Sequence, residues 1–315
     1  MRVLIYGAGV QGSFLAHVLI RANNDVTVLA RGNRAEELKR DGIVLRHYFQ
    51  QKTTVDQVKV INELKKDDIY DAIFVTMKYS DFPDVLPILA QNGSENIIVV
   101  GNNATASEME AYLETNSEKA KKIGFGFQLS GGKKEKDRII VVRFNASGMV
   151  IGSLGKEVPF TNSVEEIFKN TRYKITYEKN IDAWLKSHMI AVLPMNLAAL
   201  IKDNNFKAVA KDNRLLKPVV AAMDEGYEVL KESGYEIIPA MQANFVKRHK
   251  HMAFLFYKLY HYLPLASQVQ GSFAELKGLY DAFYEIKEKS GVLTPNLDLL
   301  VQDGRYVDFV KEIRE

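Results

Sequence analysis

The stretch Arg2-Val3-Leu4-Ile5-Tyr6-Gly7-Ala8-Gly9-Val10-Gln11-Gly12 decides the fold that we expect. Its first five residues are a short, β-branched apolar run that ends at a glycine, which is typical of a buried strand. The next six form a G-x-G-x-x-G pattern, residues 13–21 continue as an apolar-rich helix, and a second strand follows at residues 26–29. This order of strand, turn, helix and strand is the context in which the glycine pattern indicates a Rossmann-type nucleotide-binding turn.

Each glycine of this turn has its own physical purpose. Gly7 permits the tight turn, Gly9 lets a pyrophosphate approach the backbone, and Gly12 lets the helix pack close to the strand. The start of the helix offers unpaired N–H groups and a positive dipole end to the phosphates. We therefore expect the whole turn to bind a dinucleotide, through Gly7, Ala8, Gly9, Val10, Gln11 and Gly12.

The end of the second strand predicts which dinucleotide binds. An NAD site usually has Asp or Glu at this position, where it binds the ribose 2′-hydroxyl. Here the residue is Ala30, followed by Arg31-Gly32-Asn33-Arg34, and Asp25 lies at the opposite end of the strand. Two arginines without an acid favour a 2′-phosphate, so we expect Arg31 and Arg34 to bind NADP(H). The alternative is that both are ordinary solvated arginines.

Two further strand-like runs, at residues 71–77 and 96–100, are followed by Lys78 and Asn102. Ligands of open parallel sheets bind at the carboxyl ends of the strands, so both residues are candidates for the cofactor site. More strand-like runs lie at residues 122–129, 138–144, 149–151 and 173–177. Residues 131–134, Gly-Gly-Lys-Lys, are interpreted as a solvated hairpin turn.

From about residue 180 the periodicity becomes helical. It predicts helices at residues 181–201, 205–233, 239–263, 271–290 and 295–313. We therefore predict an α/β protein with an N-terminal Rossmann-type dinucleotide-binding domain at residues 1–178 and a C-terminal all-helical substrate domain at residues 179–315. A crevice between two such domains is the default ligand site.

Composition and charge exclude several classes of function. The 315 residues carry 42 Lys+Arg and 39 Asp+Glu, and a net charge of +3 is too small for a protein that mainly neutralises nucleic-acid phosphates. The absence of cysteine excludes disulfides and a cysteine nucleophile, and His249 and His251 lack a third metal ligand. Residues 187–201 are too short and too polar for a membrane span, and no leader is visible. We expect a cytoplasmic protein without a nucleic-acid or membrane partner.

Several of these motifs also occur, in the same order, in one enzyme family. They are the glycine turn, Val26–Arg31, Thr76-Met77-Lys78, Gly101-Asn102-Asn103, Asp182–Lys186, and Ala274-Glu275-Leu276, the last of which lies sixteen residues before Gly291–Pro295. Over nearly its whole length, the chain resembles ketopantoate reductase (2-dehydropantoate 2-reductase).

This resemblance implies NADPH-dependent reduction of a small-molecule 2-oxo acid to a 2-hydroxy acid, as in pantothenate biosynthesis. It implies that Lys186 is the general acid for the carbonyl oxygen, and that Glu275 contacts the substrate or orients the lysine. Lys78 and Asn102 match family positions near the nicotinamide and the substrate. An ammonium group suits this chemistry, because it can stabilise and protonate the alkoxide that hydride addition creates. A homodimer is left open.

The chain departs from the family pattern in the region that binds pantoate. The family carries asparagines four and eight residues after its lysine, where this chain has Ile190 and Pro194, and a family serine falls near Leu263. An unpaired substrate hydroxyl against these residues would cost about 1–3 kcal/mol. We therefore expect weak ketopantoate activity and better turnover of a more apolar 2-oxo acid, unless Asn196, Ser267 or Ser272 replaces the missing contacts. A catalytically silent NADP(H)-binding regulatory protein is the alternative outside enzymology.

Overall fold

A computed structural model describes residues 1–269 and 273–302 of the chain. The chain divides into two compact units. The sheet unit contains Met1–Gly101 and Thr105–Ile181, and the helical unit contains Asn102–Ala104 and the residues from Asp182 onward. The predicted α/β class is confirmed, with a parallel sheet in the N-terminal part and helices in the C-terminal part. The boundary that we expected at residue 178 compares with a division at Ile181 in the structure.

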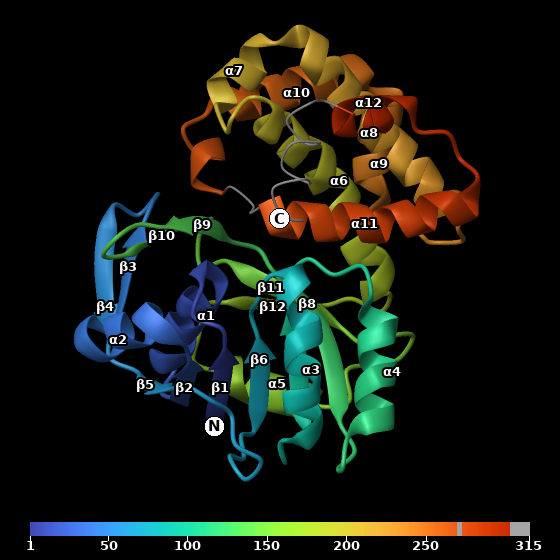
Figure 1. Ribbon diagram of the computed structural model, residues 1–315. Helices are drawn as coiled ribbons and strands as arrows, with labels where there is room; N and C mark the ends of the chain where they lie inside the picture. The colour runs from blue at the N-terminus through green and yellow to red at the C-terminus, as the bar shows by residue number, and fades with distance from the viewer. Residues whose placement is uncertain (270–272, 303–315) are drawn as a thin grey trace. The chain divides into compact units, whose positions relative to one another are not determined.

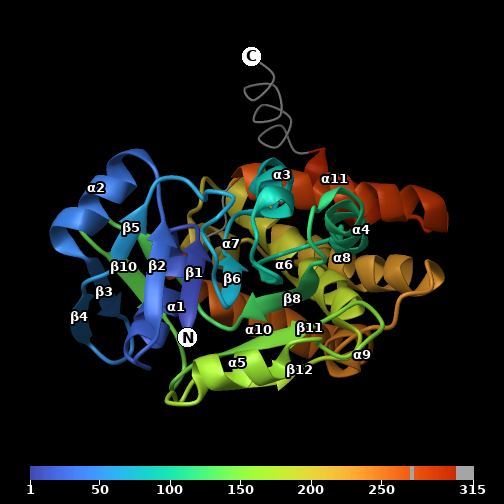
Figure 2. The same ribbon diagram turned by 90° about the horizontal axis from the view of Figure 1, so that it is seen from below.

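The sheet unit is built on an eight-stranded sheet with the order β12-β11-β8-β7-β6-β1-β2-β5 (Figures 1 and 2). Neighbouring strands from β5 to β8 are parallel, whereas β11 runs antiparallel to β8. The bounds are β1 (Arg2–Tyr6), β2 (Asp25–Leu29), β5 (Lys59–Ile61), β6 (Ala72–Val75), β7 (Asn96–Val100), β8 (Lys122–Gln128), β11 (Gly148–Gly152) and β12 (Lys174–Tyr177).

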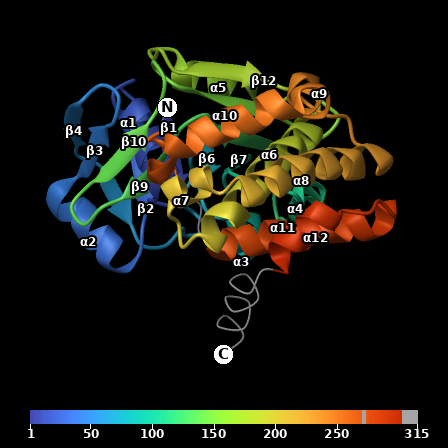
Figure 3. The ribbon, with the colours of Figure 1, turned by 90° about the horizontal axis from the view of Figure 1, so that it is seen from above.

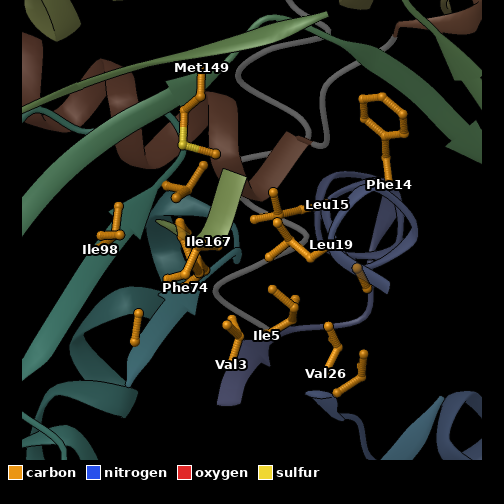
Figure 4. Packing of buried hydrophobic residues seen from close by; sticks show 14 of the residues in the cluster. Val3, Ile5, Phe14, Leu15, Leu19, Val26, Phe74, Ile98, Met149 and Ile167 are labelled. Atoms are coloured by element: carbon orange, nitrogen blue, oxygen red, sulfur yellow. The ribbon is translucent and has the colours of Figure 1, made fainter. Parts of the chain in front are cut away.

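Helices cover both faces of this sheet, with α1 and α5 on one face and α3 and α4 on the other (Figures 1 and 2). Figure 4 shows the packing on the first face, where Val3 and Ile5 of β1 lie beside Leu15 and Leu19 of α1, with Ile167 of α5 nearby. Each such buried side chain contributes about 1.5–3 kcal/mol. This core fixes α1 on the sheet. The helices are α1 (Val10–Ile20), α2 (Gly32–Asp41), α3 (Phe82–Gln91), α4 (Ala106–Asn116) and α5 (Thr161–Phe168), with a 3-10 turn η1 (Tyr79–Asp81).

A second sheet in this unit has four strands in the order β4-β3-β10-β9. They are β3 (Ile43–His47), β4 (Lys52–Asp56), β9 (Gly131–Lys134) and β10 (Ile139–Val142). The interpretation of residues 131–134 as a hairpin turn is therefore wrong, because they pair antiparallel with β10. A Cβ atom at Gly132 would lie 2.0 Å from the oxygen of Ile140 and 2.9 Å from Cγ1 of Val10. The glycine thus lets this strand approach the first turn of α1. The composition Gly-Gly-Lys-Lys gives no sign of this contact.

A buried polar cluster ties α1 to the second sheet. His17 of α1 bonds Asp56 of β4 at 2.6 Å, and its ring lies 5.1 Å from that of His47 on β3. Burial, aided by the neighbouring His17, lowers the pKa of His47 to about 4. Burial alone would raise the pKa of Asp56, but hydrogen bonds from His17 and Arg21 lower it. The cluster is therefore stable with His47 neutral and Asp56 ionised.

The helical unit is organised around α8, which packs against α9, α10, α11 and α12 (Figure 3). Its helices are α6 (Ile181–Ile201), α7 (Phe206–Lys211), α8 (Asn213–Glu232), α9 (Ala240–Arg248), α10 (Lys250–Tyr262), α11 (Phe273–Ser290) and α12 (Pro295–Val301), with a 3-10 turn η2 (Ala266–Gln268). Among the described residues, α6 is the one helix long and apolar enough to span a membrane, and 61% of its most apolar window is buried within the structure.

Two of the predicted helices are each divided in two. The helix expected at residues 205–233 breaks at Asp212, whose carboxylate accepts hydrogen bonds from the backbone N–H groups of Arg214 and Leu215 and so caps α8. The helix expected at residues 239–263 breaks at His249, which has non-helical torsion angles. The parts of the predicted helices at residues 271–272 and 303–313 lie outside the described residues.

Candidate active site

The glycine turn lies at the carboxyl end of β1, where the strand order changes direction. Following the chain, β2 and β5 extend the sheet on one side of β1, whereas β6, β7 and β8 extend it on the other. This is the doubly wound order in which ligands bind at the switch point between the first strand and the strand across from it. Thr76, which follows β6, donates a hydrogen bond to the carbonyl oxygen of Gly7 at 2.9 Å. The turn therefore occupies the expected ligand position of this fold.

The structure separates the purposes of the three glycines. Gly7 has φ +117°, and a Cβ atom there would lie 2.4 Å from the oxygen of Thr76. A Cβ atom at Gly12 would lie 1.9 Å from the oxygen of Gly7. Apart from its neighbours in the chain, no heavy atom of the described residues lies within 4 Å of a Cβ placed on Gly9. Gly7 and Gly12 are thus required by packing within the protein, whereas Gly9 leaves open space that suits the close approach of a phosphate.

The first turn of α1 also suits an anionic group. Gly9 is the residue before α1, no side chain caps the helix, and no acidic residue lies in its first turn. The first N–H groups of a helix have no partner within the helix, and its dipole is positive at that end. The side chain of Gln11 donates to the carbonyl oxygen of Ser130 at 2.7 Å and accepts from Gln128 at 2.5 Å. Gln11 is therefore held against the end of β8.

Arg31 and Arg34 lie in different environments. Arg31 is exposed, precedes α2, and places its Nη2 atom 3.4 Å from the hydroxyl of Tyr6. Arg34 donates from Nε to the carbonyl oxygen of Ala8 at 3.0 Å and from Nη2 to Ser13 at 3.1 Å. The first turn of α2 contains no acidic residue. Arg31 thus presents an accessible guanidinium beside a helix start, whereas Arg34 is bonded to the glycine turn itself.

Of the two residues that follow strands, Lys78 and Asn102, the structure brings Asn102 into contact with another candidate, Glu275. Asn102, two residues beyond β7, donates from Nδ2 to Oε1 of Glu275 on α11 at 2.9 Å. Both residues belong to the helical unit. Lys78 belongs to the sheet unit, is exposed, and directly precedes η1. The contact between Asn102 and Glu275 joins positions that are 173 residues apart in the chain.

Lys186 of α6 is a buried, ion-paired residue. Only 2% of the residue is exposed, and its ammonium forms an ion pair with Asp182, one turn earlier on α6. The same Nζ atom lies 4.7 Å from the centre of the Tyr235 ring. Sequence reasoning missed both partners. The spacing of Asp182 and Lys186, four residues on one helix, is a signal that could have found the first.

His188 is a second titratable residue on this part of α6. Its ring stacks on Trp184, with the ring centres 5.3 Å apart. Burial lowers the pKa of His188 to about 4, so this imidazole is neutral near pH 7. Lys186 is the one Lys or Arg in the sequence of α6, and it therefore carries the positive charge of this helix.

The residues that replace the family's asparagines are buried. Ile190 is 2% exposed, and a Cβ atom at Gly226 of α8 would lie 2.8 Å from its Cγ2 atom. Ile190 therefore fills space between α6 and α8. Asn196 donates to the carbonyl oxygen of Val192, and Ser267 donates to that of Pro264. Ser272 lies outside the described residues, within which no group of three His, Cys, Asp or Glu residues could hold a metal ion.

A glycine turn at the switch point of a parallel sheet, followed by an uncapped helix start, defines a dinucleotide-binding protein of the Rossmann class. Residues 3–156 match the family model of ketopantoate reductase PanE/ApbA. The chain is similar to the ketopantoate reductase family, a family of oxidoreductases, and the resemblance seen in the sequence is confirmed.

Curated relatives match along most of the chain at low identity. The 2-dehydropantoate 2-reductase of Aquifex aeolicus is 22% identical, and the alignment covers 96% of this chain and 95% of the relative. The 2-dehydropantoate 2-reductase of Pyrococcus abyssi is also 22% identical, with 78% and 79% covered. Because the first alignment covers nearly all of both chains, the likeness extends to both units.

Solved structures share the fold. A 2-dehydropantoate 2-reductase of Geobacter metallireducens superposes with a TM-score of 0.74 at 15% identity, over 98% of this chain and 99% of the other. A D-mandelate dehydrogenase in ternary complex with NADH and anilino(oxo)acetate superposes with a TM-score of 0.73 at 16% identity, over 96% of both chains. One fold thus carries enzymes that differ in substrate.

Proposed function

We propose that the protein is an NADPH-dependent reductase that converts a 2-oxo acid to a 2-hydroxy acid, as a 2-dehydropantoate 2-reductase does. The observation that carries this proposal is the buried, ion-paired Lys186 in a chain that also has an open dinucleotide turn at Gly9. A protein that only binds a nucleotide has no use for an ammonium at this position, whereas reduction of a 2-oxo acid needs a proton donor of this kind. This weighs against a catalytically silent regulator.

In this proposal residues 1–178, which include most of the sheet unit, are the cofactor domain. The turn from Gly7 to Gly12 binds the pyrophosphate through backbone N–H groups, and Arg31 binds the 2′-phosphate. Arg34 supports the turn, since its guanidinium is bonded to Ala8 and Ser13. Lys78 lies near the nicotinamide end. The open space at Gly9 and the absence of an acid after β2 both fit NADPH, which supplies the hydride when bound.

Residues 179–315 form the substrate domain in this proposal. Lys186 donates a proton to the oxygen of the substrate carbonyl as that oxygen becomes an alkoxide. Asn102 and Glu275, which are already hydrogen-bonded to each other, bind the substrate together. An amide N–H that is held by a carboxylate has a fixed orientation, so the pair is prepared to receive a polar substrate.

A more apolar 2-oxo acid is the second candidate substrate, and one observation favours it. Ile190 occupies a position where the family has asparagine, and it packs against Gly226 rather than offering a hydrogen bond. Asn196 and Ser267 both donate to backbone carbonyls, so neither is an evident replacement for the missing contacts.

We also propose a cytoplasmic location and no nucleic-acid or membrane partner. The small net charge and the lack of cysteine support this, as does the burial of most of α6. A homodimer is supported by exposed apolar side chains along α10, where Met252, Phe256 and Leu259 are each more than half exposed.

The proposal is tested by following NADPH oxidation with purified protein and a panel of 2-oxo acids. The panel pairs 2-dehydropantoate with analogues in which an apolar group replaces its hydroxyl. A kcat/KM of about 10⁴ M⁻¹s⁻¹ or more for 2-dehydropantoate would support the first substrate. Preference for an apolar analogue by tenfold or more would support the second. Failure to oxidise NADPH with any 2-oxo acid would contradict the proposed reaction.

A further inference from the structure

The partners of Lys186 suggest a function for Asp182. Asp182 lies in the first turn of α6, where the helix dipole favours a negative charge. The side chain of Asp182 is 21% exposed, whereas that of Lys186 is 3% exposed. The carboxylate is therefore the more exposed member of the ion pair.

The aromatic partner of Lys186 is held by the backbone. The N–H of Tyr235 donates to the carbonyl oxygen of Leu230 at 2.9 Å, at the end of α8. Three residues later, the N–H of Ile238 donates to the hydroxyl of Ser187, the residue after Lys186. These bonds fix the segment that carries the ring, and the face of an aromatic ring attracts a cation.

A lysine ammonium has three donors, and its surroundings account for only part of them. One N–H points to the Asp182 carboxylate, and the Tyr235 ring faces the same nitrogen without accepting a conventional hydrogen bond. The nearby His188 is neutral near pH 7 and adds no charge. Asp182 thus places a carboxylate directly on the ammonium.

We propose that Asp182 is a positioning residue for the proton donor, which keeps the buried Lys186 protonated and fixes the direction of its remaining N–H groups. This inference rests on the proposed function for its catalytic consequence. When Lys186 gives one proton to the substrate alkoxide, the oxygen becomes a hydroxyl and the lysine becomes a neutral amine. The amine then regains a proton from solvent water, and the adjacent carboxylate favours that return.

The test compares Asp182→Asn with a matched control. Asp281→Asn removes the carboxylate of another lysine pair of the same kind, Lys277 and Asp281 on α11, where the aspartate is 54% exposed. Because an opposite charge at this range shifts a titration by about 1–3 units, the alkaline fall of kcat should move to lower pH by that amount in Asp182→Asn. Asp182→Glu keeps a carboxylate, so its pH profile should stay close to that of the wild type. Asp281→Asn should also behave as wild type. Circular dichroism confirms that each variant is folded.

A second measurement separates this inference from the proposed reaction. The ¹³Cε signal of Lys186, assigned with Lys186→Met, reports protonation of the lysine without any substrate. A shift of its titration to lower pH in Asp182→Asn, but not in Asp281→Asn, supports the inference even if no 2-oxo acid is reduced. An unchanged lysine titration and an unchanged pH profile in folded Asp182→Asn would overturn it.

Discussion

The glycine turn and the surroundings of Lys186 solve the same problem, placing a charge precisely, in opposite ways. The turn uses backbone groups from one contiguous stretch, and its side chains are absent or bonded elsewhere. The candidate catalytic residues instead depend on side chains that come from separate segments: Lys186 faces Tyr235, and Asn102 bonds Glu275. Backbone sites therefore tolerate most side-chain change but not the addition of a Cβ, whereas the lysine region depends on a few individual side chains.

The largest effect is expected at the lysine. Lys186→Ala should lower turnover by roughly 10²–10⁴, because the developing alkoxide loses its proton donor. The Kd for NADPH should stay within a few-fold of wild type, since the glycine turn is unchanged. Stopped-flow turnover and fluorescence titration measure the two quantities. Lys277→Ala, which also removes an i,i+4 lysine pair, is the control, and near-wild-type turnover of Lys186→Ala would reject the assignment.

Acid should weaken the attachment of α1 to the second sheet. The pKa of His47 is depressed in the folded state, so its contribution to stability is present above about pH 6.5 and is lost as the pH falls towards 4. The lowered pKa of Asp56 acts in the same direction. The loss due to His47 should reach about 3 kcal/mol.

Urea unfolding at pH 7 and at pH 4.5 measures this loss. The drop in the free energy of unfolding should be smaller in His47→Asn than in wild type, whereas substitution of the exposed His251 should leave it unchanged. Equal drops in all three proteins would show that His47 does not couple protonation to folding.

The two types of glycine should be separable by experiment. Gly12→Ala places a Cβ 1.9 Å from the oxygen of Gly7, and overpacking of this kind costs about 1–3 kcal/mol of stability. Gly9→Ala meets no protein atom, so its stability should be near wild type while its affinity for NADPH falls. Thermal unfolding without cofactor and NADPH titration give the two readouts. The distinction between packing and ligand space fails if Gly9→Ala destabilises the free protein as much as Gly12→Ala does.

The last prediction distinguishes the two arginines, and the effect expected for Arg34 is the smallest of all. Arg31→Ala should weaken the binding of NADPH by about 10- to 150-fold and leave the binding of NADH nearly unchanged. The reason is that a charge-assisted hydrogen bond to the 2′-phosphate is worth about 1.5–3 kcal/mol. Arg34→Ala should weaken both cofactors by a similar, smaller factor of about five, since its bonds are to the turn. Parallel titrations with NADPH and NADH decide this, and equal losses for both cofactors in Arg31→Ala would show that Arg31 does not read the phosphate.

The contrast between a contiguous turn and side chains from separate segments also explains which features could be predicted from the sequence. The turn from Gly7 to Gly12 and the strands around it are local patterns, so the fold class and the position of the turn at the end of the first strand could be predicted. The strand at Gly131–Lys134 could not, because its glycines and lysines have low strand propensity and its pairing depends on contact with β10 and α1. The bond between Asn102 and Glu275 spans 173 residues, and no pattern in either segment indicates the other.

The hydrogen bond from Arg34 to Ala8 bears on how the cofactor preference could be changed. A loop that is already rigid before its ligand arrives loses less conformational entropy on binding, so under the proposed function Arg34 would pre-organise the turn for any dinucleotide. Substituting both arginines to obtain an NADH-dependent enzyme would therefore sacrifice affinity for the intended cofactor as well as for the unwanted one. A redesign that replaces Arg31 alone, with an acid placed after β2 for the ribose hydroxyl, keeps the rigid turn and redirects only the recognition of the ribose.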